Sequence, residues 1–203
     1  MGHYKVDAQE VKQRHDPQEL FDRFTQLAAT QPEGYTIDKS NAEVIEALCY
    51  YFSNVPYGKF NLNKGIFLAG NTGSGKTMMM RLFSQVVPFG FYYVDNICDY
   101  VRRDGQEPLD KIKNRSFDEL CFDDFGSEGK ITHYGSNYNV MYDIVVRRCQ
   151  DFVHHKTKTH FTSNMTMQNI RELYDLRIES RLHEMCNIVV LGGKLDYKDW
   201  RKK

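Results

Sequence analysis

The sequence has no excess of either charge, because its 27 lysines and arginines balance its 27 aspartates and glutamates. A protein that coats nucleic acid by electrostatics alone needs a surplus of cations, so the balance argues against that class and leaves only a local basic patch. No apolar run approaches the roughly 20 residues that cross a bilayer, and residues 1–15 carry no apolar signal segment. We therefore expect no membrane contact and a cytoplasmic location.

The cysteines also lack the spacing that is typical of disulfide frameworks or zinc sites. The five cysteines are odd in number, scattered, and never spaced C-x-x-C, which argues against a disulfide framework and a zinc site and favours reduced thiols. With 41% hydrophobic and 27% charged residues, the composition is that of an ordinary globular protein and excludes wholesale disorder. A chain of 203 residues is long enough to bury a substantial core.

What the chain does contain is a complete phosphate-binding loop. Residues 70–77 read G-N-T-G-S-G-K-T, between an apolar run at 65–69 and helix-forming residues at 78–83, which is the strand–turn–helix context of this pattern. The glycines let backbone N–H groups turn toward phosphate oxygens, and the helix adds its positive amino end. Lys76 can reach the β- and γ-phosphates, and the Thr77 hydroxyl can ligate Mg²⁺. We therefore expect ATP and Mg²⁺ as cofactors, with nucleotide contacts from Gly70, Asn71, Thr72, Gly73, Ser74, Gly75, Lys76, Thr77 and Met78.

Hydrophobic periodicity predicts an α/β fold. Strands alternate with helices along most of the chain, which implies a parallel sheet with helices on both faces, a three-layer αβα sandwich. Asp16 as N-cap and Pro17 at the first helical position open the first helix. The predicted strands are 65–69, 89–94, 120–125, 159–163 and 188–191, and the predicted helices are 17–29, 40–53, one from 78 onward, 96–103, 139–153, 167–173 and 176–184.

The predicted strand at 120–125 ends in two carboxylates, Asp123 and Asp124. Ligands bind at the carboxyl ends of parallel strands, so we expect this pair to lie beside the phosphate loop. There Asp123 would hold Mg²⁺ and Asp124 would polarise the attacking water. The alternative is a solvated aspartate pair at the end of a strand.

Two further polar features follow in the chain. Asn164 ends the strand at 159–163, where its amide would hydrogen-bond the γ-phosphate or the water; the alternative is an ordinary turn residue. Arg177 and Arg181 lie four positions apart and share one helix face. They form either an ion-paired surface stripe or an arginine finger, which reaches the ATP of a neighbouring subunit and stabilises the transferring phosphoryl group.

Four motifs together resemble those of the AAA+ ATPases that load bacterial replicative helicases, the DnaC/DnaI type, and of the related IstB-like transposition ATPases. The motifs are the phosphate loop, D-D-F-G at 123–126, T-S-N at 162–164 and Y-x-x-R-x-x-S-R-L at 174–182. The resemblance covers roughly residues 36–200 and implies an ATP-switched, Mg²⁺-dependent ATPase of the P-loop class. Its implied partners are single-stranded DNA and a replicative helicase or, for an IstB-like helper, a transposase.

The resemblance also assigns roles to single residues. Asn164 matches the residue called sensor 1. Arg181 matches the arginine finger best, with Arg177 as its companion, and a finger acting in trans implies a homo-oligomer in the ATP-bound state. The chain departs from the family in having about 35 residues before the matching region, no helical lid after residue 191, and Asp124 where many members have Glu. We therefore expect an N-terminal polar segment with an amphipathic helix at 1–35, and an ATPase domain at 36–203.

Candidate contacts to single-stranded DNA lie after the acidic pair. Tyr134 and Tyr138 would stack on bases and Lys130 would bind phosphate, since cations and aromatic rings together hold single strands. The alternative is that these tyrosines pack against a neighbouring helix. Arg102 and Arg103 offer a second cationic spot. Two other functions stay open, a small P-loop kinase and a scaffold that binds ATP without hydrolysing it.

Overall fold

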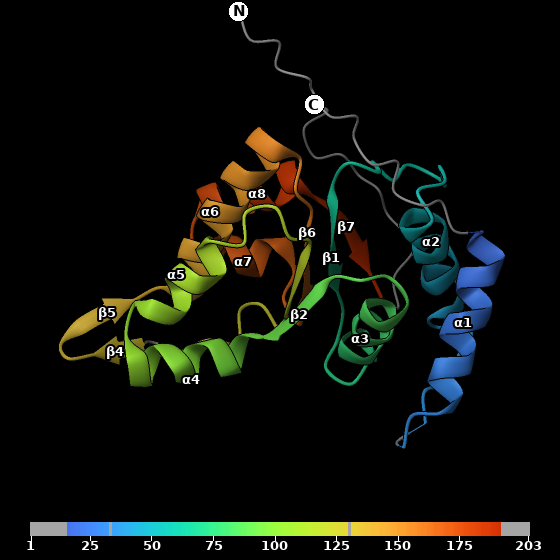
Figure 1. The fold of residues 1–203 in the computed structure, drawn as a ribbon, viewed down its shortest axis with the longest axis horizontal. Coiled ribbons are helices and arrows are strands. Elements are labelled where there is room, and N and C mark those ends of the chain that lie inside the picture. The colour runs from blue at the N-terminus through green and yellow to red at the C-terminus, as the bar shows by residue number, and fades with distance from the viewer. Residues whose placement is uncertain (1–15, 33, 130, 192–203) are drawn as a thin grey trace, which may run out of the picture.

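The computed structural model describes residues 16–32, 34–129 and 131–191, which form a parallel sheet between two layers of helices (Figure 1). The helices are α1 (Pro17–Ala29), α2 (Ala42–Phe52), α3 (Lys76–Val86), α4 (Val94–Asp104), α5 (Glu107–Lys113), α6 (Val140–His155), α7 (Met167–Leu173) and α8 (Leu176–Met185). The sheet contains β1 (Gly65–Ala69), β2 (Gly90–Tyr93), β3 (Leu120–Asp123), β6 (Thr159–Ser163) and β7 (Cys186–Val190), and a separate hairpin contains β4 (Ile131–His133) and β5 (Ser136–Tyr138). The predicted three-layer αβα sandwich is confirmed.

The five strands run in the order β2-β3-β6-β1-β7, and every neighbouring pair is parallel. Strand β6 therefore lies between β1, which leads into the phosphate loop, and β3, which ends in the acidic pair. All five residues of β1 and all five of β6 are buried, as expected of central strands with helices on both faces. The carboxyl end of β6 is thus the midpoint between the loop and the acids.

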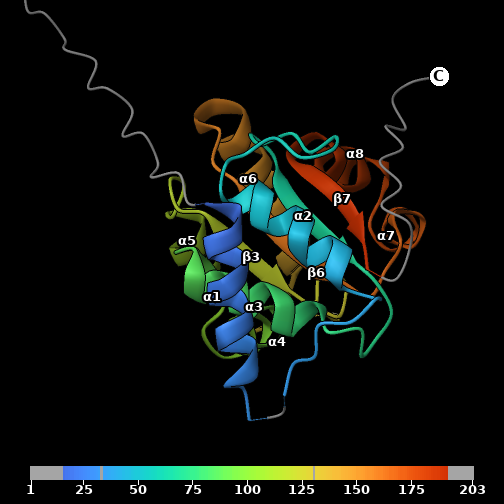
Figure 2. The ribbon, with the colours of Figure 1, turned by 90° about the vertical axis from the view of Figure 1, so that its right-hand side faces the viewer.

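The two faces of the sheet are covered by different helices, and β1 contributes to both cores because successive strand residues point to opposite faces. Ile66 and Leu68 belong to the core beneath α1, α2 and α3. Phe67 and Ala69 belong to the core beneath α4 to α8. Figure 2 shows α1, α2 and α3 lying over the first of these faces.

Helix α1 has the predicted bounds, and the Asp16 carboxylate caps it by accepting a hydrogen bond from the Gln18 N–H at 3.1 Å. Its buried residues join the core of α2, α3 and the sheet, where the ring centroids of Phe24 and Phe83 lie 4.7 Å apart. The division of the chain at residue 35 stays a prediction, and in the structure α1 shares its core with the phosphate-loop helix.

The strands at 65–69 and 159–163 and the helices at 17–29 and 167–173 have the bounds that the sequence predicts. Two elements were missed. Helix α5 has only seven residues, too few to show a helical period. The β4–β5 hairpin turns through Tyr134 and Gly135, both with positive φ, and a Tyr-Gly pair lacks the Asn-Gly or Asp-Gly signal of such turns.

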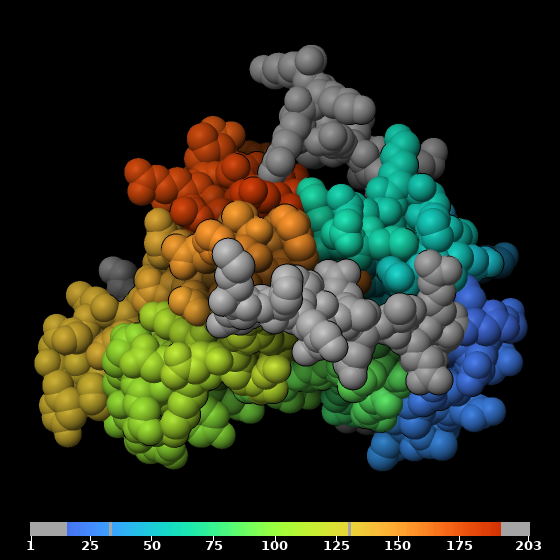
Figure 3. All heavy atoms as spheres, turned by 45° about the horizontal axis from the view of Figure 1, so that its top comes forward, coloured from blue at the N-terminus to red at the C-terminus, as the bar shows by residue number. Residues whose placement is uncertain are grey.

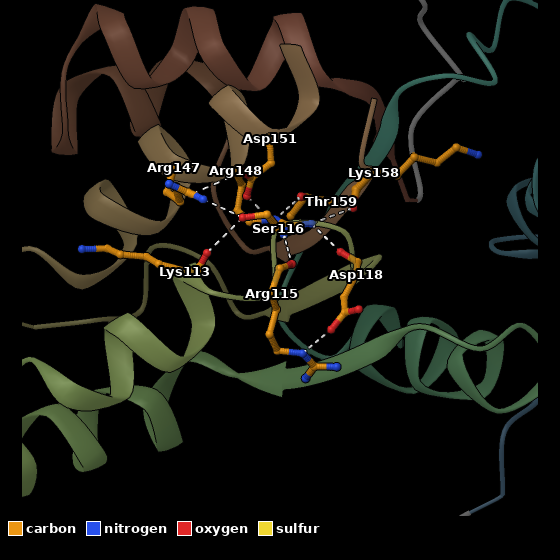
Figure 4. A network of polar contacts seen from close by, with 9 residues as sticks. All are labelled: Lys113, Arg115, Ser116, Asp118, Arg147, Arg148, Asp151, Lys158 and Thr159. Atoms are coloured by element: carbon orange, nitrogen blue, oxygen red, sulfur yellow. Dashed lines mark hydrogen bonds and ion pairs between the residues drawn. The ribbon is translucent and has the colours of Figure 1, made fainter. Parts of the chain in front are cut away.

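A buried arginine fastens α6 to the amino ends of two strands (Figure 4). Arg148 is fully buried, and a guanidinium in the core must have acceptors for its N–H groups. It forms an ion pair with Asp151 at 3.5 Å, and its other acceptors belong to the segment before β3 and to the start of β6. These are the carbonyl oxygens of Arg115 at 2.8 Å, Asp118 at 2.7 Å and Lys158 at 3.2 Å, and the Thr159 hydroxyl at 2.8 Å.

Replacing this arginine should destabilise the protein strongly. Arg148→Ala leaves three partly buried carbonyl groups without that donor, and we expect the free energy of unfolding in urea to fall by about 3–5 kcal/mol. Gln150→Ala is the matched control on the same helix, because Gln150 is exposed, and its loss should stay below about 1 kcal/mol. Equal losses in the two variants would contradict the assigned role.

Candidate nucleotide-binding site

The phosphate loop connects β1 to α3 with the backbone shape that anion binding requires. Gly73 has φ +79° and Gly75 has φ +87°, a left-handed conformation that glycine adopts without steric cost. Gly75 is also the N-cap of α3 and offers no side chain to its first turn. The N–H groups at the amino end of α3 therefore have no side-chain cap, and they form a ready site for phosphate oxygens.

Lys76 is the first residue of α3, and its side chain already points along the loop. Only 5% of the residue is exposed. Its ammonium donates hydrogen bonds to the Asn71 carbonyl oxygen at 2.9 Å, to the Ser74 hydroxyl at 3.4 Å and to the Asn164 side-chain oxygen at 2.8 Å. The loop and the end of β6 therefore hold the lysine between them.

Asn164 bridges the lysine and one of the two carboxylates. Its Oδ1 atom accepts from Lys76, and its Nδ2 atom donates to Asp124 Oδ1 at 2.8 Å. The residue is exposed at the carboxyl end of β6, so its amide can also reach a ligand. The structure thus brings Lys76, Asn164 and Asp124 into one chain of hydrogen bonds.

The acidic pair is held by Thr162 of β6. The Thr162 hydroxyl donates to Asp123 Oδ1 at 2.5 Å and accepts from the Asp124 N–H at 2.9 Å. The Phe125 N–H donates to the Thr162 carbonyl oxygen at 2.8 Å. Asp124 has φ +66°, an uncommon conformation that aspartate tolerates better than most residues. The turn after β3 is therefore locked to the end of β6.

Burial at this edge of the sheet disfavours the charged forms of Asp123 and Lys76. Burial raises the pKa of Asp123, which is 3% exposed, while hydrogen bonds from Thr162 and Thr77 lower it. Burial likewise lowers the pKa of Lys76, and the carboxylates of Asp124 and Asp123 work against that shift. Such perturbed groups gathered at one place are typical of a functional site.

The donor atoms fit a magnesium ion. The Thr77 hydroxyl lies near the Asp123 carboxylate, and both are oxygen ligands of the kind Mg²⁺ prefers. Within the described ranges, no group of three or more histidine, cysteine or acidic side chains could hold a metal by itself. Mg²⁺ commonly takes one or two protein oxygens and completes its shell with phosphates and waters.

The structure adds two residues that the sequence reading did not assign to the site. Thr162 stands inside the T-S-N motif, so the signal for it was present. Tyr35 gave no such signal, because its partner is distant in sequence: a Cβ atom built on Gly75 would lie 3.0 Å from the Tyr35 ring. Burial raises the pKa of Tyr35 to about 12, with a further contribution from Asp38. Its ring thus covers the loop at the start of α3.

The two candidate arginine fingers lie elsewhere. Arg177 is exposed and Arg181 half-buried on α8, where both line a groove of about 1000 Å³ between α6 and α8. No residue of the phosphate loop lines this groove. Neither arginine therefore shares this groove with the phosphate loop of its own chain.

The candidate DNA contacts separate into different environments. Tyr134 is 96% exposed at the tip of the hairpin, whereas Tyr138 is half-buried and packs on the core beneath α4 to α8. Lys130 lies outside the described residues. His133 Nδ1 lies 2.8 Å from the Arg102 carbonyl oxygen, so the hairpin rests on the carboxyl end of α4, which also carries Arg103. The hairpin projects at one end of the molecule (Figure 3).

In comparisons with known proteins, no family model matches the chain, and no curated protein matches its sequence. Solved structures do match. One, described as a primosome component from Streptococcus pyogenes serotype M3, is 19% identical, with a TM-score of 0.53 over 76% of this chain and 80% of that chain. DnaI is 23% identical, with a TM-score of 0.56 over 87% of this chain and 94% of that chain.

AMPPCP-bound DnaA from Aquifex aeolicus is 16% identical, with a TM-score of 0.51 over 78% of this chain and 48% of that chain. At these identities the likeness shows the fold alone, a parallel sheet between two layers of helices. The region after residue 191, where the sequence predicts no helical lid, lies outside the described residues. No helix among the described residues is both long and apolar enough to cross a membrane.

Replacing the buried Asp123 carboxylate with a neutral side chain should stabilise the ligand-free protein. Because burial raises the pKa of Asp123 above 3.8, the folded state binds this proton more tightly than the unfolded state, and stability falls as pH rises through that window. We expect Asp123→Asn to unfold at higher urea than the wild type at pH 7, with the difference shrinking as pH falls through the raised pKa of Asp123 and levelling off below 3.8. A variant less stable at pH 7 than the wild type would contradict this reading.

Proposed function

We propose that this protein binds and hydrolyses ATP with Mg²⁺, and that the hydrolysis switches an assembly of its own copies on single-stranded DNA, as in a helicase loader. One observation carries the proposal. The hydrogen bonds from Lys76 through Asn164 to Asp124, and from Thr162 to Asp123, bring a phosphate loop, two carboxylates and a polar amide to one edge of the sheet.

Each group has a task that its chemistry suits. Backbone N–H groups of residues 70–77 and the Lys76 ammonium hold the β- and γ-phosphates. Thr77 and Asp123 hold Mg²⁺, which neutralises charge that develops on the phosphate oxygens. Asp124, half-exposed, orients and deprotonates the attacking water. Asn164 offers one donor and one acceptor, so its amide can bind either the γ-phosphate or this water.

On this proposal, a second copy of the chain supplies the guanidinium that stabilises the γ-phosphate during transfer. Phosphoryl transfer gains from a guanidinium at the γ-phosphate, yet Arg177 and Arg181 line a groove that contains no part of their own loop. A neighbouring subunit that presents this groove to the loop would supply Arg181, with Arg177 beside it. Such a head-to-tail contact repeats around a ring or along a helical filament.

The replication setting is supported by the fold neighbours, which include DnaI, a primosome component and DnaA. On this proposal the protein partner is a replicative helicase. The DNA contact is the exposed Tyr134 at the hairpin tip, together with Arg102 and Arg103 on the helix beneath it. An aromatic ring next to cations is the combination that holds single strands.

ATP turnover with and without single-stranded DNA tests the proposal. We expect the strand to stimulate phosphate release. Lys76→Ala should abolish nucleotide binding, and Arg181→Ala should leave binding intact but lower turnover by on the order of 10³-fold, as loss of a finger does. Mixing the two variants should restore part of the activity, because a Lys76→Ala subunit can still offer its arginine to an intact neighbouring loop.

Four results would contradict the proposal. Unchanged nucleotide binding by Lys76→Ala would remove the loop from the site. ATP binding without any turnover would indicate a scaffold, and phosphorylation of a small acceptor would indicate a kinase. Mixtures without recovered activity would place the arginine within its own subunit.

Tyr134 should contribute to the affinity for single-stranded DNA and not to the stability of the fold. We expect Tyr134→Ala to weaken single-strand binding by about 1–3 kcal/mol, the free energy of one base stack, with unchanged thermal stability. Tyr134→Phe keeps the ring and should bind nearly as well. Tyr138→Ala should instead lower the thermal midpoint, since that ring packs on the core. Binding measured by fluorescence anisotropy checks this, and equal DNA affinity for Tyr134→Ala would refute the assignment.

A further inference from the structure

A half-buried carboxylate follows the acidic turn, residues 123–126, and has no part in the nucleotide site. Glu128 Oε2 accepts a hydrogen bond from the Gly126 N–H at 3.0 Å, and its Oε1 accepts one from the Tyr174 hydroxyl. Burial raises the pKa of Glu128, and the hydrogen bond from Tyr174 acts in the opposite direction. One carboxylate thus joins the turn to a residue far along the chain.

Tyr174 lies at the junction of α7 and α8. Its ring packs on Phe125 of the acidic turn, with the ring centroids 5.2 Å apart. The next residue, Asp175, caps α8 by accepting a hydrogen bond from the Ile178 N–H at 2.9 Å. The position of Tyr174 therefore sets where α8 begins, and Arg177 follows within the first turn of that helix.

At the other end of this connection, Phe125 and Gly126 of the acidic turn are closely packed. Phe125 is 1% exposed, and its carbonyl oxygen accepts a hydrogen bond from the Ser163 hydroxyl at 2.6 Å. Gly126 has φ +92°, a backbone conformation that favours glycine, and a Cβ atom there would lie 2.5 Å from the sulfur of the flexible Met165 side chain. The acidic turn and the segment carrying Asn164 are thus packed as one unit.

We infer that the hydrogen bond between Tyr174 and Glu128 is a positioning tie, which holds the arginine-bearing end of α8 on the acidic turn of the same subunit. The inference rests on the proposed function, because Arg177 and Arg181 need positioning only if they act at a neighbouring site. Through the tie, the state of one nucleotide site is passed to the arginines that this subunit presents to the next. Glu128 and Tyr174 are positioning residues, since neither contacts the phosphate loop.

Packing alone does not account for the pair. A phenylalanine at position 174 would keep the contact with Phe125, and an apolar residue at position 128 would avoid the cost of burying a carboxylate. The hydrogen bond adds direction, because it fixes the position of the Tyr174 hydroxyl and hence the direction of this side chain relative to Glu128. The side chain so directed belongs to the residue just before the cap of α8.

Tyr174→Phe removes only the hydroxyl and tests the tie. We expect unchanged affinity for a fluorescent ATP analogue, unchanged KM, and a kcat at least tenfold lower. The thermal midpoint should fall by no more than roughly 5 °C. Tyr142→Phe, which alters a half-buried tyrosine of α6 outside the tie, is the matched control and should keep full turnover. Glu128→Gln retains an acceptor for the Tyr174 hydroxyl and should keep more activity than Glu128→Ala.

Mixed assemblies separate this role from damage to the acidic turn itself. A Tyr174→Phe subunit has an intact nucleotide site, so mixing it with Lys76→Ala subunits, whose arginines are correctly placed, should restore activity as it does for Arg181→Ala. Recovery for Arg181→Ala but not for Tyr174→Phe would overturn the inference, because the defect would then lie in the subunit's own site. An unchanged kcat in Tyr174→Phe would overturn it as well.

Hydrogen exchange tests the tie independently of turnover. In the nucleotide-free protein, Tyr174→Phe should speed amide exchange severalfold at residues 176–180 and leave α3 unchanged. If the wild type shows no ATP turnover, the proposed function fails, and the exchange data still decide whether the tie exists. Equal exchange in the wild type and in Tyr174→Phe would refute it.

Discussion

The hydroxyl group of Thr162 is the contact on which the candidate site depends. It donates to the Asp123 carboxylate and accepts from the Asp124 N–H, so one atom sets the positions of both acids. It can do so because β6 lies between β1 and β3, which places Thr162 and Asn164 between the loop and the acidic pair. Were β1 and β3 direct neighbours, no residue could bridge the lysine to Asp124 in this way.

This arrangement lowers the stability of the ligand-free protein, and it keeps charged side chains in place where a ligand could bind. Lys76 and Asp123 are nearly buried, and burial disfavours the charged form of each. Hydroxyl, amide and carbonyl groups offset part of that cost and hold the side chains at the edge of the sheet. A magnesium-bound triphosphate would supply the charges that the buried groups lack. Functional sites commonly store strain of this kind, while the surrounding core provides the stability.

The elements best predicted from sequence were those whose signal is local. The β1–loop–α3 unit follows from apolar residues, glycines and helix formers in direct succession, and α1 from its Asp16 cap and Pro17. The β4–β5 hairpin was missed because Tyr134 takes a positive φ that its residue type does not announce. Tyr35 was missed because its contact with Gly75 joins segments that are distant in sequence.

Residue type and spacing alone indicate the chemistry of the candidate site: a phosphate loop, two adjacent carboxylates, an amide at the end of a strand and two arginines on one helix face. Which of these groups meet depends on the tertiary structure. It joined Lys76 to Asn164 and Asp124, left Arg177 and Arg181 in a separate groove, and tied Tyr174 to Glu128. The reason is physical: spacing along a strand or helix fixes the direction of a side chain, whereas the order of strands in the sheet fixes its neighbours, and that order is set by packing across the whole domain.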